Sequence, residues 1–312
     1  MVDPLAEVVT LLQPAARFSK HVLGAGAWRI RRSDAGQPFY CVVLEGGCWL
    51  ALDTLAPIEL QAGDFVLVPA AFGITLSSRV PPTDRGDTLP VAVGNGQFRI
   101  GEQAGPPDLR MLAGHCSFGS PDAALLVALL PHCVHVRGEA RLATLVQLVG
   151  DETRAQRPAR DVVLSRLLEV LLIEALRSAA GTAASPGLVR GLADVRLSAA
   201  LRAMHAQPAR EWTVAELANE AALSRSAFFD RFNKTVGVAP MAYLLAWRMA
   251  LAKDLLRRKP AGGIAEVAER VGYSSASTFS VAFARHAGQP PSHYAREQYA
   301  DEDQGSDAAL LP

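Results

Sequence analysis

Apolar residues recur at helical spacing in the last third of the chain. Phe228 and Phe232 lie four residues apart, as do Phe279 and Phe283, which places each pair on one face of a helix. The stretch between the two pairs keeps this periodicity at Tyr243, Leu244, Trp247, Leu251 and Leu255. The pattern predicts one helix from Val214, one that carries Phe228 and Phe232, and others over 241–259, 264–271 and 276–286.

Residues 15–118 instead carry short apolar stretches separated by Gly and Pro. The clearest stretches, 39–44, 48–52 and 64–68, have the composition of β-strands. Glu45-Gly46-Gly47 predicts a hairpin turn between the first two stretches. Residues 80–108, which are rich in Pro, Gly and Asp, predict a long loop.

Helical spacing returns between about 122 and 180. We expect a helix from Pro121 and Asp122 through Leu130, and an amphipathic segment from Leu142 to Val149. Residues 162–176 predict a third, strongly apolar helix. The segment 181–191, which contains Ser185-Pro186-Gly187, is typical of a linker.

The last third contains an internal repeat. Ala215-Glu216-Leu217-Ala218 matches Ala265-Glu266-Val267-Ala268 at an offset of 50 residues. Five further matches have an offset of 51: Phe228, Phe232, Gly237, Pro240 and Tyr243 correspond to Phe279, Phe283, Gly288, Pro291 and Tyr294. The second copy therefore has one extra residue near its turn.

Each copy has the features of a helix-turn-helix. Thr213 and Glu216 predict a capping box, Ala222-Leu223-Ser224 a turn, and Ser224 or Ser226 the cap of the next helix. In the second copy, residues 272–275 form the turn and cap. Two such units suit the major groove, and the helix over 241–259 is long enough to space them by one DNA turn of ~34 Å. The alternative is an all-helical bundle with no nucleic acid partner.

Length and charge agree with two domains, one of which binds a polyanion. The chain has 312 residues, enough for about two domains of ~150 residues. Residues 194–298 hold 14 Lys and Arg against nine Asp and Glu, whereas 299–312 hold four acids and no base. A basic block in a chain of zero net charge points to a polyanionic partner. The four cysteines have no CxxC spacing, and we see no secretion signal or membrane-length apolar run. We therefore expect a cytoplasmic protein with reduced thiols.

From Trp212 to Arg296 the chain resembles the DNA-binding domain of the AraC/XylS family of bacterial transcription regulators. The N-terminal part is similar to the cupin-type sensor domain of one branch of that family, through GGCWLAL (46–52), PIELQAGDFVLVP (57–69) and LPHCVHVRGEA (130–140). The resemblance implies an α+β protein with four parts. These are a cupin-like β jelly roll with a helical extension (1–180), a linker (181–193), an all-α double helix-turn-helix domain (194–298) and an acidic tail (299–312).

The same resemblance implies a sequence-specific, effector-responsive regulator that is not an enzyme and needs no cofactor. Its expected partners are double-stranded DNA, a small-molecule or oxidant effector, RNA polymerase and a second copy of the chain. A cupin enzyme fused to a DNA-binding domain is the alternative. Related sensors often carry His where this chain has Tyr40 and Ile74, which counts against a cupin metal site. A third possibility is an architectural DNA binder without a sensing role.

The candidate DNA contacts lie on and around the two recognition helices. For base readout by the first helix we expect Arg225, Ser226, Phe229 and Asp230, because Arg suits guanine, an apolar ring the thymine methyl, and Asp cytosine. The second helix shows a short, nearly apolar outer face around Val281, so its direct readout should be thin. Further candidates, some for phosphates, are Arg231, Lys234, Arg248, Lys253, Ser275, Ser277, Ser280 and Arg285. The alternative for the cations is a plain solvated face.

The chemistry of the N-terminal part is less defined. Tyr40, Trp49 and His115 are candidate ligand-pocket groups, with ordinary packing as the alternative. His132-Cys133-Val134-His135 could meet at one metal ion only if the loop folded back and a fourth ligand arrived, so we expect no metal. If Gly46-Gly47 is a two-residue turn, Cys41 and Cys48 lie ~13 Å apart and cannot bridge directly. A thiol switch through Cys116 stays open beside the simpler expectation of buried, unreactive cysteines.

Overall fold

A computed structural model of the protein describes residues 3–32, 36–53, 55–83, 86–94, 96–120, 123–155, 157–179, 186–258 and 260–297. The chain divides into two compact units. The strand unit comprises the described parts of 8–123 and 130–193, and the helical unit those of 1–7, 124–129 and 194–312. Each unit is described by itself.

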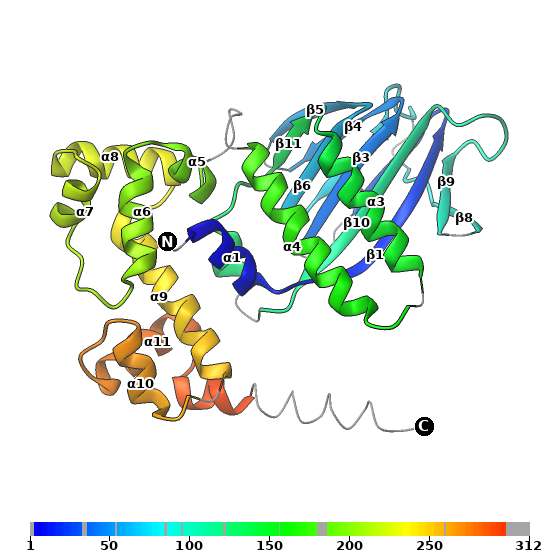
Figure 1. Cartoon of the computed structure of the whole chain (residues 1–312). Helices are drawn as coiled ribbons and strands as arrows, with labels where there is room; N and C mark the ends of the chain where they lie inside the picture. The colour runs from blue at the N-terminus through cyan, green and yellow to red at the C-terminus, as the bar shows by residue number, and fades with distance from the viewer. Residues whose placement is uncertain are drawn as a thin grey trace, which may run out of the picture. The chain divides into compact units, whose positions relative to one another are not determined.

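The strand unit is built from two facing β-sheets. In the described residues a seven-stranded sheet has the order β11-β6-β3-β10-β1-β9-β8, and a four-stranded sheet has the order β2-β7-β4-β5. The strands are β1 Pro14–Ala25, β2 Arg29–Arg32, β3 Gln37–Glu45, β4 Gly47–Leu52, β5 Leu55–Gln61, β6 Asp64–Ala71, β7 Ile74–Ser78, β8 Val91–Gly94, β9 Gln97–Gly101, β10 Leu109–Phe118 and β11 Val134–Arg137. Two helices, α3 Ala140–Arg154 and α4 Arg160–Ala179, cover the outer face of the larger sheet (Figure 1). The predicted jelly roll with its helical extension is confirmed.

Alternation along the strands explains why both faces of the larger sheet are apolar. In β3, Phe39, Cys41 and Val43 point into the core between the sheets, whereas Tyr40 and Val42 point to the opposite face. Both sets are buried because the second sheet covers one face and the helices cover the other. A strand buried on both sides is therefore apolar throughout.

The expected hairpin at Glu45-Gly46-Gly47 is wrong. β3 pairs with β10 and β6, and β4 pairs with β5 and β7, so the turn carries the chain from one sheet to the other. Gly46 has a φ of 78°, and a Cβ on it would lie 1.9 Å from the carbonyl oxygen of Asp108. Only glycine fits where the chain crosses from one sheet to the other against the Asp108 backbone. β3 and β4 face each other across the core, so no hydrogen-bonded ladder joins them.

Three further expectations need correction. The predicted loop 80–108 contains β8 and β9, and β9 runs parallel to β1 and extends the larger sheet. The expected linker ends in a short helix, α5 Leu188–Ala193, while 180–185 lie outside the described residues. The helix expected over 121–130 is described only as α2, Ala123–Val127, and Pro121 and Asp122 lie outside the described residues.

The helical unit follows the sequence pattern closely. Its helices are α6 Leu197–Ala206, α7 Val214–Glu220, α8 Arg225–Val236, α9 Pro240–Arg257, α10 Gly263–Arg270 and α11 Ala276–Ala287. The unit also takes in the start of an N-terminal helix, α1 Pro4–Leu12. Within the described part of the chain, no single helix has the length and apolar content to cross a membrane, and only the pair α8 and α9, bent by 56°, passes that test jointly.

Local capping explains where these helices begin. Thr213 and Glu216 form the predicted capping box at α7. Ser224 accepts a hydrogen bond from the Ala227 N–H, and Ser275 accepts one from the Thr278 N–H, so each recognition helix has a serine N-cap. The left-handed glycines Gly237 and Gly288 end the same two helices.

The two turns show where the repeat gained its extra residue. The Leu223 N–H donates to the Ala218 carbonyl, and the Tyr273 N–H donates to the Ala268 carbonyl, both at 2.9 Å. The offset is still 50 at this point and becomes 51 at the serine caps, so Ser274 is the insertion. The preceding residue is left-handed in both copies, as Ala222 with φ 50° and as Gly272 with φ 82°.

This comparison predicts opposite effects of exchanging the two turn residues. Ala222→Gly should raise the free energy of unfolding by about 0.5–1 kcal/mol, because relief of the left-handed strain on Ala exceeds the entropy that Gly adds to the unfolded chain. Gly272→Ala should lower it by about 1–3 kcal/mol, because the new Cβ would also lie 2.6 Å from the Ala209 carbonyl oxygen. Urea unfolding followed by circular dichroism measures both effects.

Gly288→Ala is the matched control, since Gly288 is also left-handed but has open space around its Cβ position. It should cost only the backbone strain. Equal losses for Gly272→Ala and Gly288→Ala would show that the contact with Ala209 has no energetic effect.

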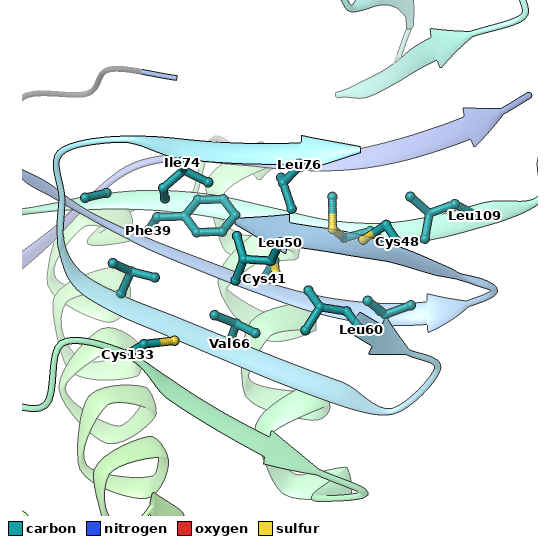
Figure 2. Close-up of a cluster of buried hydrophobic side chains, with 14 of the residues drawn as sticks. Phe39, Cys41, Cys48, Leu50, Leu60, Val66, Ile74, Leu76, Leu109 and Cys133 are labelled. Atoms are coloured by element: carbon teal, nitrogen blue, oxygen red, sulfur yellow. The ribbon is translucent and has the colours of Figure 1, made fainter. Parts of the chain in front are cut away.

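All four cysteines are buried thiols. Cys41, Cys48 and Cys133 lie in the core between the sheets, among Phe39, Leu50 and Val66 (Figure 2). Cys41 and Cys48 thus face one core from different sheets, which replaces the hairpin geometry expected for them. Burial raises the pKa of Cys48 and of Cys116 to about 12, that of Cys133 to about 11, and that of Cys41 well above its ordinary value.

We therefore expect all four thiols to be unreactive in the native protein. Because the thiolate is the reacting species, labelling by Ellman's reagent near neutral pH should be at least ~100-fold slower than in urea, where all four should react. Hypochlorite treatment should leave DNA affinity unchanged. Fast labelling of even one native cysteine, together with altered DNA affinity, would restore the thiol switch.

Candidate functional site

The recognition helix α8 is held from behind by three aromatic rings. Phe228 and Phe232 are fully buried, and their ring centroids are 5.5 Å apart. Tyr243 of α9 meets Phe232 edge-on at 5.8 Å. Since one face of α8 is fixed in this way, the opposite face is presented to solvent.

The second recognition helix, α11, is held by the matching triad. Phe279 and Phe283 lie 5.5 Å apart, and Tyr294 meets Phe283 edge-on at 5.6 Å. The Lys253 ammonium, itself buried, lies 5.5 Å from the centre of the Tyr294 ring. The sequence repeat thus reflects the same packing of two phenylalanines and one tyrosine in both copies.

One helix contributes to the cores of both copies. Tyr243, Leu244 and Trp247, in the first half of α9, are buried beside the first triad. Met249, Ala252 and Leu256, farther along, belong to the core that includes Phe279 and Phe283. Within the helical unit, α9 runs from the α7–α8 pair to the α10–α11 pair (Figure 1). Both recognition helices are therefore positioned by the same helix, α9.

A buried histidine that the sequence analysis missed links this frame to the N-terminus. The His205 ring stacks on Trp247 at 4.1 Å, and its two nitrogens lie 2.8 Å from Glu7 Oε2 and 2.7 Å from the Tyr243 hydroxyl. Burial lowers the pKa of His205, against the opposing effect of Glu7. The neutral ring that follows donates from Nδ1 to the carboxylate and accepts from the tyrosine O–H at Nε2. No local pattern reveals this contact, because 198 residues separate its partners.

The outer face of α8 carries polar and charged groups. Arg225, Ser226 and Asp230 are exposed, and Phe229 is 41% exposed. Neither Arg225 nor Asp230 has an ion-pair partner among the described residues. Phe229 is therefore not part of the core, and Asp230 forms no ion pair with a described arginine.

The remaining cations named from the sequence separate into two groups. Arg231 is paired with Asp194 at 2.7 Å. Arg248 donates to the carbonyls of Pro208 and Arg210, and Lys253 is buried. All three side chains are engaged in contacts within the helical unit, which corrects their expected role as phosphate contacts. Lys234 and Arg285 are exposed, and no ion pair of theirs is found in the part of the chain that the structure describes.

The acid that holds Arg231 illustrates the first group. Asp194 accepts hydrogen bonds from Arg231 and from the backbone N–H groups of Arg196 and Leu197. Partial burial acts to raise the pKa of Asp194, but these donors outweigh it and lower the pKa overall. The pair ties α8 to the start of α6.

The outer face of α11 is poorer in groups that read bases. Ser275 is occupied as the N-cap, and the Ser280 hydroxyl donates to the Ala276 carbonyl of its own helix. Ser277 is exposed and near Ser275, at 3.0 Å between the hydroxyls. The centre of the face is Val281, which is 73% exposed.

The strand unit contains a cavity between its sheets. Its buried walls are Trp28, Phe39, Leu76, Ile100, Met111 and His115. The half-buried or exposed part of the lining includes Lys20, Arg32, Pro90 and Phe98. The enclosed part of the cavity measures about 70 Å³, below the range of roughly 300–1,000 Å³ typical of small-molecule sites.

Of the three expected pocket residues, only His115 lines this cavity. Tyr40 points to the other face of its sheet, where its ring fills the space that Gly114 leaves open. Trp49 alternates with the core residues Cys48 and Leu50, so its side chain points outward from β4. The expectation is wrong for Tyr40 and Trp49 because the residue type alone does not tell which face of a strand is the inside.

The His132-Cys133-Val134-His135 segment does not converge on one point. Cys133 is in the core, His132 is exposed, and His135 lies 3.1 Å from Asp64. Among the described residues there is no group of three or more His, Cys, Asp or Glu side chains placed to hold a metal ion.

The comparisons with known proteins agree with this architecture. Residues 3–181 match the family model described as a cupin, and residues 217–297 match that of a helix-turn-helix domain. A putative AraC-like transcription regulator of Streptomyces lividans is 35% identical over 302 residues, which cover 94% of this chain and 98% of the relative. One from Streptomyces antibioticus is 36% identical over 303 residues, with the same coverage of both chains.

Solved structures match as well. The DNA-binding domain of AdpA, crystallised in complex with a target DNA, is 28% identical, with a TM-score of 0.33; the match covers 34% of this chain and 96% of that domain. The near full-length relatives and the cupin match establish the family. The chain belongs to the AraC-like transcription regulators, and it is a DNA-binding regulator with an N-terminal ligand-binding cupin domain.

Proposed function

We propose that this regulator recognises a specific DNA sequence mainly through α8, while α11 anchors it on the same duplex. The observation that carries the proposal is the contrast between two recognition helices held by the same aromatic triad. The outer face of α8 offers Arg225, Ser226 and Asp230, whereas that of α11 centres on the apolar Val281. Base discrimination needs hydrogen-bonding groups at the groove floor, so it should be concentrated in the first half of the site.

Within this proposal, Phe229 contacts a thymine methyl, and Ser277 and Ser280 lie near the DNA at the second groove. Lys234 and Arg285 contact phosphates, since both are exposed cations whose ion-pairing capacity is not taken up by a described neighbour. Ser275 acts through its cap, which orients the first turn of α11. Phosphate contacts set position and affinity without reading sequence.

The cupin domain is proposed to sense a small molecule and to have no catalytic activity of its own. The support for a ligand site in this domain is the apolar cavity between the sheets. The relatives are named as regulators, and the alternative of a fused cupin enzyme finds no metal-holding cluster among the described side chains. An oxidant effector is disfavoured by the buried, poorly ionised cysteines.

The first test selects tight-binding duplexes from a random DNA pool with the full chain. We expect bases fixed strongly in one segment and weakly in a second segment about one turn away. Arg225→Ala should then weaken binding to the selected site by ~1–3 kcal/mol and relax the preference at one base. Mobility-shift titrations on the site and on its single-base variants measure both effects.

Two variants separate base readout from charge. Lys234→Ala should weaken binding to selected and random DNA alike and should flatten the salt dependence. Arg231→Gln removes a cation that is already paired with Asp194, so its effect should appear in stability rather than in base preference. Equal loss for Arg225→Ala on selected and random DNA, or no enrichment at all, would contradict sequence readout and favour the architectural alternative.

The outer stripe of α4 supports a second partner, another copy of the chain. Val162, Val163 and Val170 are 64%, 41% and 40% exposed, and the last two are seven residues apart on one helix. A seven-residue apolar spacing suits a helix-to-helix seam. We propose that the regulator is a homodimer through this stripe and that it acts together with RNA polymerase.

Sedimentation of the full chain at micromolar concentration tests the seam. The wild-type chain should sediment as a dimer, and Val163→Glu with Val170→Glu should shift it to monomer, because charges would be buried without partners. Val195→Glu, at a position that is 89% exposed outside the stripe, is the matched control and should leave the dimer intact. A monomeric wild-type chain would rule out the seam.

A further inference from the structure

We infer that α11 recognises the 5-methyl group of a pyrimidine, which is thymine in ordinary DNA, through the side chain of Val281. This inference rests on the sequence-specific function proposed above and names the base that the second segment of the DNA site contains. It follows from a comparison, position by position, of two recognition helices that are packed in the same way.

The two recognition helices correspond residue for residue. α8 runs from Arg225 to Val236 and α11 from Ala276 to Ala287, at the same offset of 51 residues as the paired phenylalanines. Each helix has a serine N-cap and a left-handed glycine at its C-cap. Corresponding side chains therefore point in the same direction relative to the buried rings of their own copy.

Val281 lies at the centre of the outer face of α11. The helical period places it directly opposite Phe279 and Phe283, whose rings are fully buried. It corresponds to Asp230, one of the residues that we propose for base readout by α8. Since Val281 is 73% exposed, its two methyl groups are the part of this face that extends farthest toward a bound groove.

The first turn of α11 differs from that of α8 in the same sense. Where α8 has the long, charged Arg225, α11 has Ala276, which cannot reach a base edge with a hydrogen bond. The cation near the end of each helix is kept, because Lys234 corresponds to Arg285 and both are exposed. The second helix thus retains a phosphate contact of the kind proposed for the first helix without its charged base-reading groups.

The hydroxyl groups of α11 are engaged in hydrogen bonds around their own helix. Ser275 accepts from the Thr278 N–H, and its hydroxyl oxygen lies 3.0 Å from that of Ser277 and 2.8 Å from that of Thr278. The Ser280 hydroxyl donates to the Ala276 carbonyl at 2.7 Å. Van der Waals contact is therefore the main interaction that the centre of this face offers to a base.

An apolar side chain in the major groove distinguishes pyrimidines by one feature. Thymine presents its C5-methyl group there, whereas cytosine presents an amino donor and no methyl group. Contact with Val281 would remove the methyl group from water, and burial of one such group changes an affinity about fourfold. Because valine has no hydrogen-bonding group in its side chain, it should treat thymine and 5-methylcytosine alike.

The test uses the full chain and the duplex selected from the random DNA pool. Each thymine of the second segment is replaced in turn by uracil, cytosine or 5-methylcytosine, with the matching base on the other strand. At one position, thymine and 5-methylcytosine should bind about equally, and uracil and cytosine about fourfold more weakly. Readout by hydrogen bonds would instead group thymine with uracil, which carry the same donors and acceptors. Mobility-shift titration measures all four duplexes.

Variants assign the effect to this side chain. Val281→Ala should abolish the difference between methylated and unmethylated bases, and it should not lower the unfolding temperature because the position is exposed. Val195→Ala removes the same methyl groups at a position that is 89% exposed outside the recognition helices, so it should keep the difference. Replacement of thymine by uracil in the first segment should have the same effect on Val281→Ala as on the wild-type chain.

Two results would overturn the inference: a second segment in which no position favours the methylated bases, or a preference for them that persists in Val281→Ala. With the first segment still fixed, either result would leave the proposed sequence-specific regulator in place. A pool that yields no fixed bases at all would contradict sequence-specific binding itself, and the inference with it, so the two failures are distinguishable.

Discussion

The DNA-binding half of this protein depends on the burial of α9 on two sides. Tyr243 and Trp247 close the first core, and Met249 and Leu256 contribute to the second. Each large apolar side chain that is buried contributes roughly 1.5–3 kcal/mol, and α9 contributes several to each side. The recognition helices are short, 12 residues each, and helices of this length are marginal in isolation. Both the position and the stability of the recognition helices therefore depend on packing against α9.

The local rules of the sequence were sufficient for this half. The capping box at Thr213, the serine caps and the paired phenylalanines each act within four residues of chain, so their geometry follows from spacing alone. The repeat supported these predictions further, because the same helices and turns had to fit both copies with a single inserted residue. The structure assigns that insertion to Ser274, two residues after the left-handed Gly272.

The strand half shows where such reasoning stops. Alternation identified β3 and β4, but a period of two residues does not tell whether two successive strands pair or face each other across a core. The hairpin at Gly46 failed for this reason, whereas Tyr40 lies outside the cavity lining because residue type alone does not tell which face of a strand is the inside. Of the expected cavity residues only His115 lines the cavity, and the lining residues Lys20 and Arg32 were missed because their strands, β1 and β2, lie in different sheets.

The contact between Glu7 and His205 was out of reach for a different reason. It joins the first helix to α6 across most of the chain, and nothing near either residue marks it. The contact nevertheless connects Glu7 to the recognition helix. The Glu7 carboxylate bonds to His205, His205 bonds to Tyr243, and Tyr243 packs against Phe232 of the recognition helix. A hydrogen-bonded chain whose central members, His205 and Tyr243, are buried resists rearrangement, so Glu7 stabilises the packing behind α8.

Ion pairing within the helical unit determines which of its cations remain available on the surface. Four acids of the helical unit form ion pairs within it: Asp194 pairs with Arg231, Asp254 with Arg257 and Arg258, Glu216 with Arg210, and Glu266 with Arg270. The exposed pairs among them add little stability, but all of them cancel the charge of arginines that serve packing and helix ends. The excess of bases over acids in residues 194–298 therefore reaches solvent at positions such as Arg225, Lys234 and Arg285. A chain with no net charge can attract DNA because neutralisation is local, and Arg225, Lys234 and Arg285, which escape it, lie on the recognition helices.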